Sequence, residues 1–282
     1  MLAIVALIEY FIGLLSIFLT FILLYRIFRF KSLLALWKSS PPLALLFFSI
    51  SLMSIVGAVL CIHWILFILH VLPNVPQHAI VRYCLGFSFN VAAYFYTSAT
   101  LGVIVQRICF FLWPLKSVRK MNKPIVCVVI AVWLASVTIY GIPNVITLLP
   151  EATVLEGCYS LNCSPFLSKP IYSNVATLFL TLSTTSLGTV LQFVYMWFKR
   201  QHQSGANSSL NKFVRYAFYI DLLFKTVPIC LDTLLGFTVN IRFGNYIGPY
   251  NALGIVLDFL VCTILKKDIL SPVHGNHEVY HI

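Results

Sequence analysis

Long apolar runs recur along the chain, and short stretches rich in proline, asparagine, glycine and serine separate them. Each run is close to or longer than the ~20 residues that an α-helix needs to cross a bilayer core. None of them shows the alternation of apolar and polar residues, with a period of two, that is typical of membrane barrel strands. The pattern predicts seven transmembrane helices, over residues 2–25, 43–72, 80–106, 125–149, 173–198, 213–239 and 246–265.

Composition supports a membrane protein. The 282 residues are 60% hydrophobic and only 10% charged, with a mean hydropathy of +0.93. A soluble domain of this size would need many more charges to cover its surface. The chain has no internal repeat and no linker long enough to divide it. We therefore expect an all-α membrane protein in which residues 1–282 form a single seven-helix bundle.

The positive charges indicate both the partner and the orientation of the chain. Its net charge is +11, but the basic residues form short clusters between the apolar runs, which fits an anionic lipid bilayer rather than nucleic acid. Fifteen Lys and Arg residues fall in one alternating set of connections together with the tail, and three fall in the other set. The positive-inside rule then places the amino terminus outside and the carboxyl terminus inside. Residues 266–282 would form a short cytoplasmic tail.

Two local features on the predicted outer side agree with this orientation. Asn162 begins an Asn-Cys-Ser glycosylation acceptor, although Asn207 begins a second acceptor on the predicted inner side. Cys84 lies at the outer start of the third segment, and an oxidising compartment would favour a disulfide bond from it to the following outer loop. That loop holds two cysteines, so either Cys158 or Cys163 is a candidate partner.

The stretch VIVQRICFFLWPLK, residues 103–116, carries a resemblance to G-protein-coupled receptors. In that superfamily the third helix ends with an acid–Arg–aromatic triplet, and a proline follows seven residues after the arginine. Arg107 and Pro114 have this spacing, and Cys84 precedes Arg107 by about the separation found in the superfamily. Gln106 replaces the acid and Ile108 the aromatic residue.

In its details the chain looks most like the nematode serpentine chemoreceptors of class BC. The resemblance implies a chemosensory receptor of sensory neuron cilia, in the plasma membrane, that binds a small molecule and activates a heterotrimeric G protein. It is also compatible with receptor oligomers. The chain departs from rhodopsin-like receptors because residues 254–260 lack the Asn-Pro-x-x-Tyr element and the sixth segment lacks Cys-Trp-x-Pro.

Candidate functional residues fall at the two ends of the bundle. Arg107 could simply reach water from the membrane edge, or it could tether the inner helix ends and be released to meet a G protein. The coupling and switch candidates on this side are Gln106, Arg107, Pro114, Lys199 and Arg200. On the outer side we expect a small, partly apolar ligand. Its candidate lining residues Asn90, Tyr94 and Thr97 could instead form hydrogen bonds between helices.

The sixth segment carries both signs of charge at membrane depth. Asp221, Lys225 and Asp232 are spaced to lie near one face of a helix, and Pro228 stands between them. Unpaired charges are costly in a bilayer, so we expect this face to turn inward and its charges to be paired. A local Asp221–Lys225 pair is one interpretation. The alternatives are a bridge from Lys225 to Asp258 on the seventh segment and contact between Asp232 and the ligand.

A small transporter or channel subunit is the main competing class. Transporters often contain repeated halves with matching broken helices, and the sequence shows neither. We expect no enzymatic activity, cofactor or metal, because His63 and His70 have no acid or cysteine spaced to complete a site.

Overall fold

The structure is a computed structural model that describes residues 2–30, 32–113, 115–146, 170–201, 215–216, 218–220, 222–228 and 230–231. Within these residues the chain forms helices and short connections, and no strand occurs. The helices are α1 (Leu2–Phe30), α2 (Leu33–Ser39), α3 (Pro41–Ile68), α4 (Pro76–Leu112), α5 (Leu115–Ile146), α6 (Pro170–Gln201) and the π-helix η3 (Leu222–Thr226). Five of them, α1 and α3–α6, are long and apolar enough to cross a membrane. This part of the chain is therefore all-helical and of membrane type.

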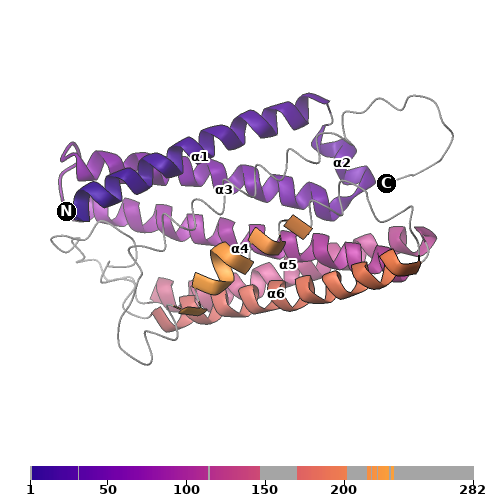
Figure 1. Cartoon of the computed structure of the whole chain (residues 1–282). Coiled ribbons are helices and arrows are strands. Elements are labelled where there is room, and N and C mark those ends of the chain that lie inside the picture. Colours follow the sequence, from indigo (N-terminus) through magenta and orange to yellow (C-terminus); the bar gives the residue numbers. More distant parts are fainter. Residues whose placement is uncertain are drawn as a thin grey trace.

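The five long helices lie side by side, and successive helices run in opposite directions (Figure 1). Helix α4 contacts α3, α5 and α6, whereas α1 packs mainly against α3. Accordingly, 72% of the residues are buried in an apolar 18-residue stretch of α4, compared with 17% in the corresponding stretch of α1. The helix that carries Gln106 and Arg107 is thus the central one among those described.

Proline residues set the start of three helices. Pro41, Pro76 and Pro170 are each the first residue of their helix. The first N–H groups of a helix have no partner within it, so a residue without an N–H is well tolerated there. These three prolines therefore belong to the helices and not to the predicted connections, and the predicted segments begin a few residues too late.

The end of α3 is closed by a Schellman motif. The N–H of Val71 donates to the carbonyl of Leu66 at 2.9 Å, and the N–H of His70 donates to Phe67 at 3.0 Å. His70 has a φ of 58°, the left-handed conformation that this motif requires. Glycine usually fills this position, so a histidine here is a weak indication that α3 stops.

The ends of α3 and α4 differ from the predicted ones. Helix α3 ends at Ile68 and not at residue 72. Helix α4 continues to Leu112, so Gln106 and Arg107 lie inside it and not at its end. Trp113 then adopts an extended conformation, as a residue before proline prefers.

Two further differences concern the connections and the later segments. The short helix α2 was not predicted, and α5 already begins at Leu115, so residues 116–123 form its first turns instead of a connection. The sixth predicted segment is described as short helical pieces between residues 215 and 231. The seventh, 246–265, and the tail lie outside the described residues.

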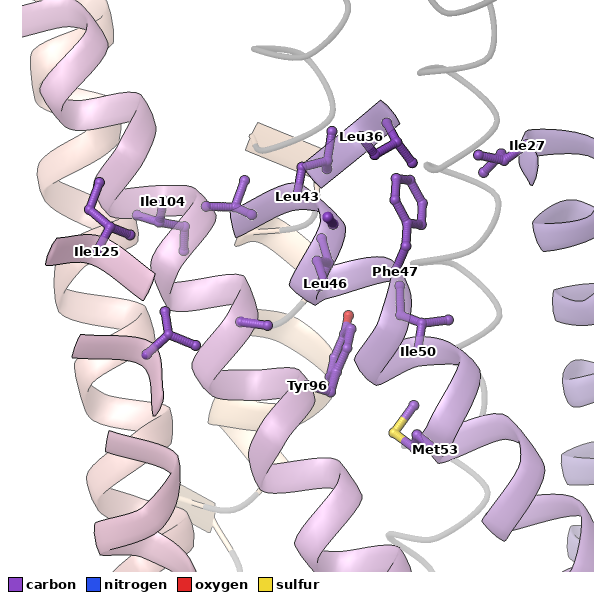
Figure 2. Close-up of a cluster of buried hydrophobic side chains, with 14 of the residues drawn as sticks. Ile27, Leu36, Leu43, Leu46, Phe47, Ile50, Met53, Tyr96, Ile104 and Ile125 are labelled. Carbon is purple, nitrogen blue, oxygen red and sulfur yellow. The ribbon is translucent and has the colours of Figure 1, made fainter. Parts of the chain in front are cut away.

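A cluster of buried apolar side chains joins the helices in the half of the bundle where α1 ends (Figure 2). Between membrane-spanning helices such side chains stabilise the bundle mainly through close van der Waals packing. Phe47 of α3 is fully buried, and Leu36 anchors α2 to the bundle with only 2% of its surface exposed. Labelled members from the other helices are Ile27 of α1, Tyr96 and Ile104 of α4, and Ile125 of α5.

Helices α4 and α5 approach closely at Gly102. A Cβ atom added to this glycine would overlap Cγ2 of Val129, which is fully buried on α5. Small residues at helix crossings allow such close contact in membrane proteins. Gly102 therefore permits the contact between these two helices.

Exposed basic side chains gather at the end of the bundle where α1 and α6 finish and α5 begins (Figure 1). They are Arg26 and Arg29 of α1, Lys38 of α2, Lys120 and Lys123 of α5, and Arg200 of α6. By the positive-inside rule this is the predicted cytoplasmic end. It is called the basic end below, and the opposite end, where α1 begins, the outer end.

Candidate functional site

Gln106 connects three helices at the basic end. The side chain is buried, and its Oε1 accepts a hydrogen bond from the Ser40 hydroxyl at 3.0 Å. Its Nε2 donates to Oδ1 of Asn122, on α5, at 2.8 Å. A primary amide can accept and donate at the same time, which a carboxylate cannot do. One residue of α4 therefore holds the beginnings of α3 and α5.

The position of Ser40 explains why its hydroxyl is available to Gln106. Ser40 precedes α3 as its N-cap residue, where a serine side chain usually accepts a bond from the first turn. Here it makes no such bond, and the next two residues are Pro41 and Pro42. Prolines have no N–H, so fewer donors at this helix start need a cap. The hydroxyl can then donate to Gln106, which lies 66 residues away in the sequence.

Arg107 is next to Gln106 but does not take part in this bridge. It is also buried, with 9% of its surface exposed, and its Cζ lies 5.6 Å from the centre of the Phe110 ring. Among the described residues, Nε of Arg107 has no hydrogen-bond partner. At the basic end, the hydrogen-bonded amide of Gln106 thus lies beside the buried guanidinium of Arg107. The Nε of Arg107 remains able to donate a hydrogen bond.

Replacing Gln106 by leucine is expected to destabilise the protein. Leucine preserves the volume but leaves Ser40 and Asn122 without their partner, at a cost of about 1–3 kcal/mol for a buried polar group. Thermal unfolding in detergent should show a lower midpoint than for the wild type. Gln106→Glu is the matched control, because it still accepts from Ser40 and the Asn122 amide can rotate to donate. Equal midpoints for the leucine variant and the wild type would show that the bridge does not stabilise the bundle.

Two of the three candidate ligand-lining residues on α4 form hydrogen bonds to other helices. Asn90 donates to the Tyr140 hydroxyl of α5 at 2.8 Å, and the hydroxyls of Tyr94 and Thr177 of α6 lie 3.4 Å apart. Thr97 donates to the carbonyl of Ala93 in its own helix. The bonds of Asn90 and Tyr94 hold the outer half of α4 against α5 and α6, while ligand contact by these residues stays a prediction.

Aromatic rings surround these hydrogen bonds. The Tyr140 ring stacks on Phe87 with centroids 5.3 Å apart and meets Tyr94 edge-on at 5.4 Å. Trp133 of α5 packs against this group and donates its indole N–H to the carbonyl of Val91 at 3.1 Å. Large apolar faces and a few oriented polar groups are the usual lining of a small-molecule site, and they also suit a packed helix contact.

The structure describes only some of the remaining candidate residues. Cys84 and Arg200 are exposed, at the outer and basic ends respectively. The side chains of Lys199 and Lys225 are outside the described set, as are the residues Pro114, Cys158, Asn162, Cys163, Asp221, Asp232 and Asp258. The disulfide bond, the glycosylation site and the charge pairs of the sixth segment therefore stay predictions.

The sixth segment contains a π-helix that the sequence analysis did not anticipate. η3 extends from Leu222 to Thr226, and the half-buried Pro228 follows it. Pro228 has no N–H to offer to the carbonyl four residues before it, a position inside η3. Wider turns of this kind often occur at functional sites in helices. The face that we inferred for Asp221 and Lys225 assumed a regular α-helix, so that spacing argument does not hold through η3.

Several partners in this arrangement could not be predicted from the sequence. Ser40, Asn122 and Tyr140 lie in other helices, and no local motif marked them as partners of α4. Arg82 was counted only as one of three basic residues on the outer side, but it is one of the most deeply buried side chains, with 2% of its surface exposed. A basic residue close to a predicted helix start normally indicates a solvated boundary, which explains the omission.

Comparisons with known proteins do not assign the chain to a family. No protein-family model matches it. No curated protein matches it either. The functional interpretation therefore depends on the residues and contacts described above.

Proposed function

We propose that the chain is a chemosensory receptor that couples to a heterotrimeric G protein. The protein would span the plasma membrane seven times, with the basic end in the cytoplasm. A small, partly apolar molecule would bind among the helices toward the outer end, and the G protein would bind at the basic end. By the resemblance to nematode serpentine receptors, the membrane would be that of a sensory cilium.

The observation that carries this proposal is the pair Gln106 and Arg107 on the central helix. Gln106 bonds to the beginnings of α3 and α5, so a shift of α4 would disturb this bridge. Arg107 is buried beside it, and its Nε has no hydrogen-bond partner among the described residues. A guanidinium offers five donors in a fixed fork, well suited to backbone carbonyls or carboxylates of a partner protein. Movement of α4 would therefore both open the bridge and expose a binding group.

The outer half of the bundle is suited to sense a ligand. Asn90 and Tyr94 connect α4 to α5 and α6 through hydrogen bonds among aromatic rings. A ligand that replaced one of these bonds would change the contacts of α4 along its length. A ligand can shift such an equilibrium only by its difference in affinity for the two arrangements. The site would thus recognise small molecules with both an apolar body and a polar group.

Ligand-dependent nucleotide exchange tests this proposal directly. The chain would be reconstituted in lipid nanodiscs with a purified heterotrimeric G protein and screened against small volatile and water-soluble organic compounds. We expect at least one compound to accelerate nucleotide exchange in discs with the receptor and not in empty discs. Flux of a compound across proteoliposomes without a G protein, together with no acceleration of exchange, would contradict the proposal and favour a transporter.

A further inference from the structure

Arg82 is buried close to the outer end of the bundle. It lies in the second turn of α4, and 2% of its surface is exposed. An arginine near the end of a transmembrane helix would normally extend its side chain to water, because its stem is long enough to do so. Arg82 instead turns inward, against α3. Contact with water therefore does not explain why an arginine occupies this position.

Two aromatic rings of α3 cover the guanidinium. Its Cζ lies 3.8 Å from the centre of the Phe67 ring and 5.7 Å from that of Trp64. Tyr10 of α1 stacks on Trp64, with the two ring centroids 5.7 Å apart. Cation–π contacts stabilise the face of a guanidinium. They leave the N–H groups in its plane without acceptors.

The donors of Arg82 are unpaired within the described residues. Nε, Nη1 and Nη2 are all buried, and none has a hydrogen-bond partner there. The other titratable groups that face this site add no negative charge: His63 of α3 and His78 of α4 have ring centroids 6.2 Å apart. Glu9 of α1 is the only acidic residue among the described ones, and no ion pair joins it to Arg82. A buried charge without a counter-charge is strongly unfavourable.

We propose that Arg82 binds the carboxylate of a small organic acid with an apolar chain. The fork of the guanidinium matches the two oxygens of a carboxylate, and the pair is stronger at a site shielded from water. Trp64, Phe67 and Tyr10 would contact the apolar chain. Phe67, which covers the guanidinium, and the nearby His63 and His78 are only partly buried, so the ligand would approach the donors from this side. This inference depends on the proposed function in one respect, because it names the ligand class of that receptor.

Thermal unfolding of the ligand-free protein gives the first test. Arg82→Met keeps most of the volume and removes the charge, and such replacements of buried ions are often neutral or stabilising. We expect its melting temperature to equal or exceed that of the wild type. Arg29→Met is the matched control, since Arg29 is exposed at the basic end. A lower melting temperature for Arg82→Met, restored by removing Glu9, Glu151 or Glu156, would show that Arg82 pairs within the chain and would overturn the proposal.

Binding of octanoate to the protein in nanodiscs gives the second test, and it requires no G protein. We expect octanoate to bind the wild type and raise its melting temperature, and Arg82→Met to weaken binding about tenfold or more. Arg82→Lys should retain part of the affinity, and 1-octanol should compete poorly. Equal binding to the wild type and Arg82→Met, equal competition by 1-octanol, or no binding of any carboxylate would overturn the proposal.

A further binding experiment shows whether the acid reaches the site from the bilayer or from water. Palmitate added to the nanodisc lipid reaches Arg82 from the bilayer, whereas octanoate reaches it from water. Binding of either acid that depends on Arg82 supports the carboxylate site and indicates its source. If octanoate binds but no compound stimulates nucleotide exchange, the carboxylate site stands and the receptor function fails. If neither acid binds while compounds without a carboxylate stimulate exchange, the receptor function stands and this site fails.

Discussion

Gly102→Ala is expected to lower the stability of the bundle by about 1–3 kcal/mol, the range for overpacking in a filled core. The added methyl group would overlap Cγ2 of Val129, whose β-branched side chain cannot easily rotate away. Alanine is otherwise the better helix former by about 1 kcal/mol, so a loss of stability would be due to packing. The midpoint of thermal unfolding and the amount of protein at the cell surface would both report the change.

Gly141→Ala provides the matched control on α5. A Cβ there would lie 3.4 Å from the Phe87 ring, an ordinary van der Waals distance, so this variant should be neutral or more stable. The double variant Gly102→Ala with Val129→Ala should lose less stability than the sum of the two single variants. If Gly102→Ala were as stable as Gly141→Ala, the close approach of α4 and α5 would not be essential.

Arg107→Ala is expected to remove most ligand-stimulated nucleotide exchange while the protein still reaches the cell surface. The guanidinium is buried next to the Gln106 bridge, and its Nε has no partner among the described residues. Its removal breaks none of the hydrogen bonds that join α3, α4 and α5. Folding should therefore be preserved, while the group proposed to meet the G protein is lost.

The control for this prediction is Arg29→Ala, which removes an exposed arginine at the same end of the bundle. This variant should couple normally at equal surface level. If Arg107→Ala also coupled normally, Arg107 would be an anchor at the membrane edge and the proposed role in coupling would be wrong. Comparing the two variants at matched surface expression separates loss of coupling from loss of protein.

The helices could be predicted from sequence because their signal is local. A run of apolar residues must form a helix in a bilayer, where backbone groups find no water. The helix ends were less predictable. The end of α3 depends on His70 in a left-handed conformation, and α2 is a short helix held by Leu36 against the core. Neither feature has a distinctive sequence pattern.

The contacts of the candidate site could be predicted only in part. The resemblance drew attention to Arg107, but the interhelical bonds at this end are made by Gln106, with partners 66 and 16 residues away. Such pairings depend on how the helices rotate and cross, which residue spacing does not fix. Arg82 shows the same limit, since its burial results from Trp64 and Phe67 on another helix.

The length of α4 has a mechanical consequence. Its 37 residues extend for about 55 Å, well beyond a hydrocarbon core of ~30 Å, and no proline follows Pro76 within it. Such a helix behaves as a rod, so a small rotation at Arg82 would turn the segment around Gln106, about 36 Å away, by the same angle. Bending would instead be concentrated in the sixth segment, where η3 and Pro228 weaken the regular hydrogen bonding. Under the proposed receptor function, a signal would be transmitted by rotation of one stiff helix against a second helix that can bend.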